Sequence, residues 1–313
     1  MGSTFSIVLY GCDRFRLETA AQAASGEVRR LERLLSALRP ESVCSLVNRH
    51  AAQRPVRIST ELFRLLALCF EHSRETDGAF DVTVGPLKRA WGFFGGTGSV
   101  PSADALAAAR RHVGHHLVRL DGGTQTVQFD HSGVEIDLGG VGKGYAVDRV
   151  TEILRGHGVD TALVAGSASS LCGLGAPPAE PRGWRADIRD TERRGARVAE
   201  VFLRDTSLST SGTGEKCFWS HGTMYSHILD PRTGWPLQSI TQVSVVTPRA
   251  VDGEVWAKAC LLNGPGWAAE YAPDTCRVLA GVAGGNGVAP DDAPAAATER
   301  RCGAGSRVTY ATK

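Results

Sequence analysis

The sequence lacks several features that would place it in a specialised class of protein. Its 313 residues contain no run of about eighteen consecutive apolar residues, so no membrane span is predicted. An excess of one charge sign is also missing, because 35 basic residues oppose 33 acidic ones and the formal net charge is +2. A dedicated DNA- or RNA-binding protein is expected to carry a net basic field, so nucleic acid is not an expected partner.

The cysteines lack the spacing of a metal site. None of the eight forms a Cys-x-x-Cys pair, and several lie in apolar runs, where cysteine behaves as a small buried hydrophobe. The opening residues MGSTFSIVLYG lack the basic region and the small-residue cleavage site of an export signal. Scattered cysteines without an export signal favour a reducing, cytoplasmic compartment.

The composition is that of a globular protein with a substantial core. Hydrophobic residues make up 42% and charged residues 22%, which excludes a disordered chain. Aromatic residues reach only 7%, so the core must depend on Leu, Val and Ala. The 37 glycines predict many loops and close backbone approaches.

Helix and strand patterns are mixed along the chain. A strand is predicted at 4–11, a helix at 16–38, a second helix at 59–72 with Ser59 as its N-cap, and a third after Ser102. Further strands are expected at 117–120, 126–129, 134–137, 161–165, 184–189, 198–203 and 242–247. Short hairpins among these strands favour an α+β fold with mixed, largely antiparallel sheets.

The motifs show no internal repeat and no convincing linker. We therefore expect a single folded unit at 1–280. The segment 281–313, which is rich in Ala, Gly and Pro up to about residue 300, is expected to be a C-terminal tail.

A glycine-rich segment, DLGGVGKGYAVD at 137–148, follows a predicted strand and opens a predicted helix. Such a turn bares backbone N–H groups at a helix N-terminus, where the helix dipole stabilises an anion. Lys143 adds a mobile positive charge. The segment has neither the GxxxxGK[ST] nor the GxGxxG spacing, so the residues alone leave two interpretations open. One is a phosphate contact, and the other is a tight strand–helix joint with a surface lysine.

Residues 209–236 combine hydroxyl side chains, glycines, a lysine and two histidines. His227 lies in the apolar run YSHIL and is followed by Asp230. A histidine titrates near neutrality and can act as a general base. A nearby carboxylate can orient the imidazole ring, and Asp230 is the candidate for that role. The alternative is a structurally satisfied histidine before a β-turn.

Glu254 and Lys258 lie four residues apart in a predicted helix at 253–264. Such a pair stabilises an isolated helix by about 0.3 kcal/mol, which would be a purely structural role. The functional alternative is a carboxylate aimed at a cation.

The segment 76–93 presents a small-residue turn, an aromatic ring and an acid at Ala79, Phe80 and Asp81. It suits a flat heteroaromatic ring with a polar edge. It equally suits a packed loop with a capping aspartate.

Taken together, these segments resemble the ApbE family, the FAD:protein FMN transferases. The resemblance runs from Met1 to about residue 280, in the order of the family's motifs. The matching motifs are M-G-[ST]-x-F at the start, S-x-x-x-P-x-S-x-x-x-x-x-N at 36–48, GAFD-x-T-x-G-P-L at 78–87, WGF at 91–93, IDLGG-x-x-KGYAVD at 136–148, STSG at 209–212 and HILDP-x-TG-x-P at 227–236.

The resemblance implies a mixed α/β single unit that uses FAD as a substrate. With a divalent metal, usually Mg²⁺, such proteins cleave the FAD pyrophosphate and pass the FMN half to a Thr or Ser of an acceptor flavoprotein. The acceptor site is [ST]-G-A-T-like, the product is a phosphoester-linked flavin, and AMP leaves. Two alternatives stay open: an FAD pyrophosphatase, in which water replaces the acceptor hydroxyl, and a catalytically impaired FAD-binding protein.

The resemblance also assigns roles to single residues. His227 resembles the family histidine that assists attack on phosphorus, with Asp230 close by in the sequence. Gly140 matches a position whose backbone oxygen ligates the metal, and three further residues align with the late metal motif: Glu254, Ala257 and Lys258. The expected contacts to FAD are Met1, Ala79, Phe80, Asp81, Asp137, Lys143 and Ile228.

The late metal motif departs from the family's A-D-x-x-[AD]-T pattern. Here the aligned residues 253–258 read GEVWAK. Glu254 keeps a carboxylate on a longer stem, Ala257 has no acid, and Lys258 replaces the hydroxyl. Asp252 is the acid instead if the helix begins earlier. An ammonium repels a metal unless it takes over part of the metal's charge role on the pyrophosphate.

Two further departures concern ring packing and an acid. Leu38 stands where many members have an aromatic residue over the ring system, and the lost stacking is worth about 1 kcal/mol. The segment 162–170, ALVAGSASS, supplies hydroxyls where the family often has an acid in N-x-GG-D.

Overall fold

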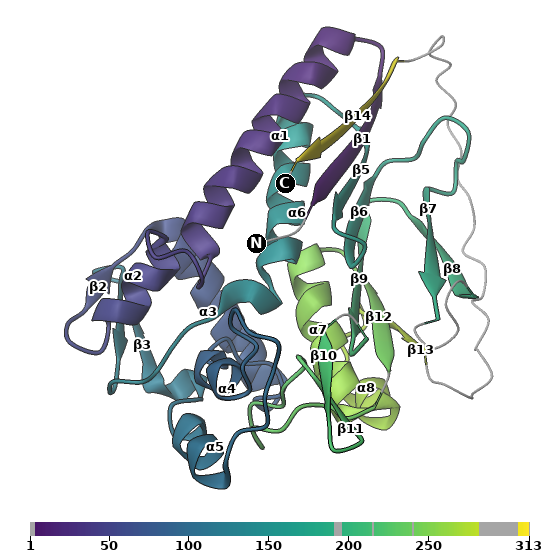
Figure 1. The fold of residues 1–313 in the computed structure, drawn as a ribbon. Coiled ribbons are helices and arrows are strands. Elements are labelled where there is room, and N and C mark those ends of the chain that lie inside the picture. Colours follow the sequence, from purple (N-terminus) through teal and green to yellow (C-terminus); the bar gives the residue numbers. More distant parts are fainter. Residues whose placement is uncertain (1–3, 191–195, 215, 240, 282–305, 313) are drawn as a thin grey trace.

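The computed structural model describes residues 4–190, 196–214, 216–239, 241–281 and 306–312. Within them, helices cover one face of an antiparallel sheet and a two-stranded hairpin covers the other (Figure 1). The strand order of the sheet is β13-β12-β9-β6-β5-β1-β14. Its strands are β1 (Phe5–Gly11), β5 (Thr161–Gly166), β6 (Ser170–Leu174), β9 (Thr206–Gly212), β12 (Gln242–Thr247), β13 (Arg277–Gly281) and β14 (Ser306–Thr312).

The remaining elements surround this sheet. The helices are α1 (Arg14–Leu35), α2 (Val43–His50), α3 (Thr60–Glu75), α4 (Gly85–Ala90), α5 (Ala103–Arg110), α6 (Gly142–Gly156), α7 (Ala250–Asn263) and α8 (Pro265–Tyr271). A small sheet has the strand order β2 (Val56–Arg57), β4 (Thr126–Phe129), β3 (Val118–Asp121). One hairpin pairs β7 (Trp184–Arg189) with β8 (Arg197–Leu203). A second hairpin pairs β10 (Cys217–Ser220) with β11 (Thr223–Ser226). No helix in the described ranges is both long and apolar enough to cross a membrane.

The two faces of the sheet follow from the alternation of side chains along β1. Phe5, Ile7 and Leu9 are buried in the core that α1 and α6 share with the sheet. Val8 and Tyr10 point the other way and pack against β7 and β8. Because successive side chains of a strand alternate between faces, one strand serves two apolar layers.

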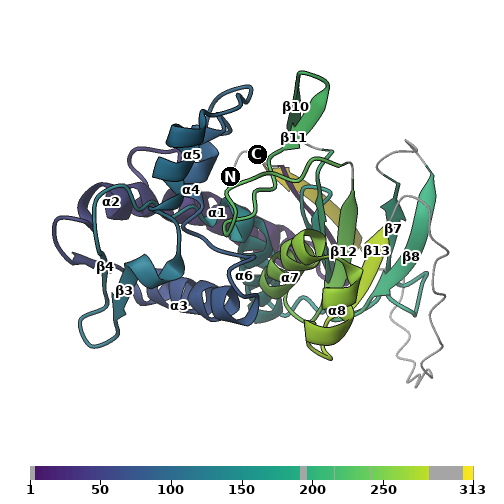
Figure 2. The ribbon, with the colours of Figure 1, turned by 90° about the horizontal axis from the view of Figure 1, so that it is seen from below.

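The helix α7 lies between α6 and β12 and is buried on most of its surface (Figure 2). Two close approaches hold it there. A Cβ at Gly144 of α6 would lie 2.5 Å from the carbonyl oxygen of Ala250, and one at Gly253 would lie 2.7 Å from Thr247 Oγ1. Charged side chains on such a helix need partners, which matters for the site below.

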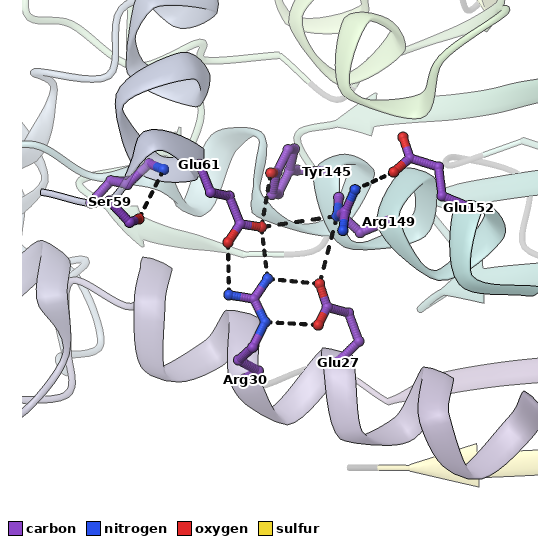
Figure 3. Close-up of polar contacts among 8 residues, drawn as sticks. Glu27, Arg30, Ser59, Glu61, Tyr145, Arg149 and Glu152 are labelled. Atoms are coloured by element: carbon purple, nitrogen blue, oxygen red, sulfur yellow. Dashed lines mark hydrogen bonds and ion pairs between the residues drawn. The ribbon is translucent and has the colours of Figure 1, made fainter. Parts of the chain in front are cut away.

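A cluster of ion pairs ties α1, α3 and α6 together (Figure 3). The Arg30 guanidinium donates to both Glu27 and Glu61, each at 2.7 Å, and Tyr145 donates to Glu61. The Arg149 guanidinium lies 3.6 Å from Glu27. Donation from Arg30 lowers the pKa of Glu61, so this carboxylate is ionised at neutral pH and its pairs are formed.

The predicted α+β class with largely antiparallel sheets is confirmed. Ser59 caps α3, as predicted, by accepting from the N–H of Leu62. The predicted strand at 134–137 is wrong, because Asn48 replaces a strand ladder there. Its side chain accepts from the N–H of Ile136 and donates to the carbonyl of the same residue, both at 2.8 Å.

The predicted tail at 281–313 contains a strand that the sequence patterns did not indicate. β14 pairs antiparallel with β1 along its whole length, from Phe5 opposite Thr312 to Gly11 opposite Ser306. Residues 306–312 are therefore part of the main sheet, and 282–305 lie outside the described residues.

Candidate functional site

One pocket gathers most of the residues that the sequence singled out. It opens between α4, α6, α7, the end of β9 and the segments 79–84, 137–140 and 227–231. Predicted residues on its wall are Ala79, Phe80, Asp81, Asp137, Gly140, Lys143, His227, Ile228, Glu254 and Lys258. Residues as far apart in the chain as Ala79 and Lys258 thus meet at one place.

The pocket is rich in lysine. The chain has five lysines, and three of them, Lys88, Lys143 and Lys258, line this pocket. The nearly neutral charge of the whole protein hides this concentration. A cleft with several amines in a poorly hydrated wall favours a polyanion such as a pyrophosphate.

Asp137 lies at the entrance to the glycine-rich turn and is almost fully buried. One carboxylate oxygen accepts from the N–H of Gly139 at 2.8 Å, and the other forms a close ion pair with Lys88. Burial alone would raise the pKa of Asp137, but the charge and hydrogen bond of Lys88 outweigh it, so the pKa lies below its usual value. Asp137 is therefore ionised, and its carboxylate holds both the glycine-rich turn and the side chain of Lys88 in position.

Glu254 projects from α7 into the pocket and is 3% exposed. Its Oε1 accepts from Ser170 Oγ at 2.5 Å and lies 3.4 Å from Lys143 Nζ. Its Oε2 has no hydrogen-bond partner among the described residues. Asp252, the alternative acid, binds His72 Nε2 at 3.0 Å and Arg249 at 3.1 Å and is not on the pocket wall, so Glu254 is the acid of this pair that reaches the pocket.

Lys258 lies one turn further along α7. Its Nζ donates to the carbonyl oxygen of Gly140 at 2.7 Å and to that of Glu254 at 3.1 Å. Burial lowers the pKa of the Lys258 amine to about 8, so the amine carries its charge at pH 7. The expected helix-stabilising pair of the Glu254 carboxylate with Lys258 is absent from the ion pairs of the described residues; Glu254 pairs with Lys143.

The residues at the aligned metal positions do not suit a divalent cation. The Gly140 carbonyl, one expected ligand, is taken by the Lys258 ammonium. Ala257 is fully buried and has no donor atom, which leaves Glu254 as the single carboxylate. No cluster of three or more His, Cys, Asp or Glu side chains in the described ranges is arranged to hold a metal. Mg²⁺ prefers an octahedral shell of oxygens, which these positions do not offer.

His227 lies on the opposite wall, at the end of β11. Its Nδ1 is 3.0 Å from the carbonyl oxygen of Lys216 and can only donate to it, so Nε2 carries the lone pair. Burial lowers the pKa of His227 to about 4, and the positive charge of Lys88 adds to the effect. The imidazole is therefore neutral and can accept a proton.

The expectation that Asp230 orients His227 is wrong. The Asp230 carboxylate binds the guanidinium of Arg232 at 2.9 and 2.8 Å and also accepts from the N–H of that residue. Asp230 is not on the pocket wall, and the backbone carbonyl of Lys216 accepts from the imidazole instead.

The segment after α3 supplies the apolar part of the wall. Ala79, Phe80 and Ile228 are buried and face the pocket, so they are placed to contact a ring system. Asp81 also borders the pocket, but its oxygens accept from Thr83 at 2.8 Å and from the N–H of His115 at 2.8 Å. This matches the interpretation of a capping aspartate that shapes the loop.

Two predicted positions lie elsewhere. Met1 is outside the described residues. Leu38 is 65% exposed and is not on the pocket wall, so no side chain at that position covers a ring in this structure.

Two further residues contact the site through partners that the sequence did not reveal. Lys88 lies in α4, which turns its side chain toward Asp137. The pattern GPLKRA, with proline at the start of a helix, was the available signal. Ser170 begins β6, and only the fold brings its hydroxyl to Glu254.

The family model described as "ApbE family" matches residues 1–280. An FAD:protein FMN transferase of Klebsiella pneumoniae is 33% identical over 265 residues, which cover 82% of this chain and 78% of that relative. One of Treponema pallidum is 32% identical over 247 residues, covering 74% of this chain and 68% of the relative.

Solved structures show the same likeness. The flavinyl transferase ApbE of Pseudomonas stutzeri in its apo form has a TM-score of 0.79 and 29% identity, covering 91% of this chain and 89% of that one. The ApbE protein of Thermotoga maritima has a TM-score of 0.80 and 27% identity, covering 88% and 90%. The match in sequence, fold and motif order extends through the segments that build the pocket, and the chain belongs to the ApbE family.

Proposed function

We propose that this protein is an FAD:protein FMN transferase, which attaches FMN through a phosphoester bond to a Thr or Ser hydroxyl of an acceptor flavoprotein. The observation that carries the proposal is one pocket with a neutral histidine on one wall and three lysines on the others. This pairing supplies a proton acceptor and positive charge at the same place, which phosphoryl transfer requires.

FAD is proposed to bind with its pyrophosphate against the lysines and its ring system against the apolar wall. Lys143 of α6 and Lys258 of α7 both line the pocket, and we propose that they contact the phosphate oxygens. Phe80 and Ile228 are proposed to pack against a ring of the dinucleotide. Asp137 acts through Lys88 and the N–H of Gly139, so we assign it a positioning role.

The reaction is a displacement at the phosphorus of the FMN half. The acceptor oxygen forms a bond to this phosphorus, and the bond from the phosphorus to the bridging oxygen breaks. AMP leaves with the bridging oxygen and its electron pair. His227 Nε2 takes the proton of the attacking hydroxyl, while Lys143 and Lys258 stabilise the charge that develops on the bridging oxygen.

The low pKa of His227 fits this role once FAD is bound. In the empty pocket the nearby lysines and burial favour the neutral ring. Phosphate charges placed beside the imidazole favour its protonated form and raise its pKa, so His227 becomes a stronger base with substrate present.

Two parts of the sequence-based expectation stay predictions, namely the [ST]-G-A-T-like acceptor site and cytoplasmic placement. The expected use of Mg²⁺ is not part of this proposal. No step above uses a metal, because the residues at the aligned positions do not suit one.

One incubation tests the function and separates it from the alternatives. The protein is mixed with FAD in Mg²⁺ and, separately, in EDTA, with and without an acceptor that carries an [ST]-G-A-T-like site, and both AMP and acceptor-bound flavin are measured. Transfer predicts flavin on the acceptor together with AMP. AMP release independent of acceptor identifies a pyrophosphatase, and FAD binding without AMP identifies a binding protein.

A further inference from the structure

The three pocket lysines differ in how their charge is balanced. Lys88 is paired with Asp137 and Lys143 with Glu254. Lys258 contacts only the carbonyl oxygens of Gly140 and Glu254, and no carboxylate of the described residues lies within ion-pair distance of it. Lys88 and Lys143 thus each have a carboxylate partner, whereas the ammonium of Lys258 is held by carbonyl oxygens alone.

The position of this charge is set by rigid parts of the fold. Lys258 is on α7, which the close approaches at Gly144 and Gly253 hold against α6 and the sheet. Its Nζ is fixed by the Gly140 carbonyl at the turn that opens α6. A charge held in this way is preorganised and needs no reorganisation when a pyrophosphate arrives.

The same contact works against a divalent cation. Mg²⁺ binds oxygen ligands at about 2.0–2.1 Å, so an ion on the Gly140 carbonyl would lie close to the ammonium that already donates to that oxygen. Like charges at such a separation repel strongly in a buried site. Ala257 offers no compensating ligand.

We propose that the Lys258 ammonium replaces the divalent cation in this protein, so that the FAD pyrophosphate is bound and activated without a metal. The inference rests on the proposed use of FAD. It adds that a fixed ammonium on α7 takes the charge role that the family resemblance assigns to a metal.

The first experiment uses the unmodified protein and measures FAD binding by titration calorimetry, in excess EDTA and in millimolar Mg²⁺. The expected dissociation constants agree within about twofold, and Mg²⁺ alone gives no binding heat. A tenfold or larger loss of FAD affinity in EDTA, or stoichiometric binding of Mg²⁺ alone, would overturn the proposal.

The second experiment compares two variants at the same position. Lys258→Met removes the charge and supplies no oxygen ligand, so FAD affinity should fall at least tenfold with or without Mg²⁺. Lys258→Thr frees the Gly140 carbonyl and adds a hydroxyl beside Glu254, so its affinity should fall in EDTA and recover in Mg²⁺. Unchanged affinity of Lys258→Met in EDTA contradicts the proposal, and so does equal recovery of both variants in Mg²⁺.

A matched control removes a positive charge outside the pocket. Arg119 is 70% exposed in its side chain and pairs with Asp130 on the small sheet, so Arg119→Thr should bind FAD as the unmodified protein does. Thermal unfolding of each variant shows whether α7 still packs. If a variant does not fold, the comparison of EDTA and Mg²⁺ on the unmodified protein still decides the question.

The readouts keep this inference separate from the proposed function. Transfer of FMN that requires Mg²⁺ would refute the role of Lys258 and leave the transferase intact. Metal-independent FAD binding that depends on Lys258, without transfer to any acceptor, would refute the transferase and support the role of Lys258 as the pyrophosphate cation.

Discussion

The imidazole of His227 donates from Nδ1 to the carbonyl oxygen of Lys216, at 3.0 Å. The bond fixes both the ring plane and the tautomer, and it leaves Nε2 as the acceptor in the pocket. A backbone carbonyl thus does what a carboxylate does in many catalytic histidines, without adding a negative charge that would compete with the pyrophosphate.

Replacing this residue separates chemistry from binding. His227→Ala should lower the rate of FMN transfer at least about 100-fold, which is the contribution expected of a positioned general base. FAD affinity should change little, because the lysines and the apolar wall remain. Single-turnover AMP release and FAD titration measure the two quantities. Transfer at a normal rate would contradict the assigned role.

The complementary variant concerns the residue that was wrongly expected to orient His227. The Asp230 carboxylate binds Arg232, so Asp230→Asn should leave the pH dependence of transfer unchanged. A shift of the acidic limb in this variant would show that Asp230 acts on the imidazole after all.

The low pKa of His227 makes a prediction for the acidic limb of the rate. Its folded-state pKa, about 4, lies below the ordinary value of 6.5, so the free protein keeps a neutral imidazole down to about pH 5. We therefore expect kcat/KM for FAD, which reports the free enzyme, to stay level between pH 7 and about pH 5. A half-maximal value near pH 6.5 would mean that the ring titrates like an exposed histidine.

Asp137 and Lys88 form a buried ion pair, so substitutions of the two residues should have non-additive effects on the free energy of unfolding. Asp137→Asn keeps the acceptor for the N–H of Gly139 but leaves Lys88 without its counter-charge, which costs about 3–5 kcal/mol of unfolding free energy. The double variant Asp137→Asn, Lys88→Met should lose less than the single variant. Urea denaturation measures both, and additive losses would argue against a coupled pair.

How far the sequence predicted these contacts depends on their kind. The N-cap Ser59 and the β-forming residues of segment 4–11 are local signals, and both predicted their elements correctly. The β14 strand pairs with residues about 300 positions away, so nothing near it in the sequence reveals its partner. Every residue has a backbone carbonyl, so a contact such as that of the Lys216 carbonyl with His227 cannot be predicted from residue type.

The segment 253–258, which aligns with the metal motif, is a second case in which the sequence did not reveal a three-dimensional contact. The sequence revealed that Lys258 stands where a hydroxyl is common, and it left open whether the amine excludes or replaces a metal. Only the fold shows that Nζ reaches the carbonyl oxygen of Gly140, a residue 118 positions away. The functional effect of a lysine at position 258 therefore depends on the distance between its Nζ and the Gly140 carbonyl oxygen, which the spacing of residues in the sequence does not give.

The close packing of α7 predicts a contrast between two glycines in helices. A Cβ at Gly253 would lie 2.7 Å from Thr247 Oγ1 and 2.8 Å from Ser209 Oγ, so Gly253→Ala should lower the unfolding free energy by about 1–3 kcal/mol. Gly26 in α1 has open space around it, so Gly26→Ala should raise stability by about 0.5–1 kcal/mol. Chemical denaturation measures the unfolding free energies of both variants, and equal changes would contradict the close packing of α7.

The central claim is that this pocket transfers FMN to a protein hydroxyl. The most direct measurement follows the intact mass of an acceptor with an [ST]-G-A-T-like site, incubated with the protein and FAD, together with released AMP. The account predicts one FMN per acceptor in phosphoester linkage, one AMP for each FMN, and no adduct when the acceptor hydroxyl residue is replaced by Ala. AMP without an adduct, or an adduct that survives that replacement, would contradict it.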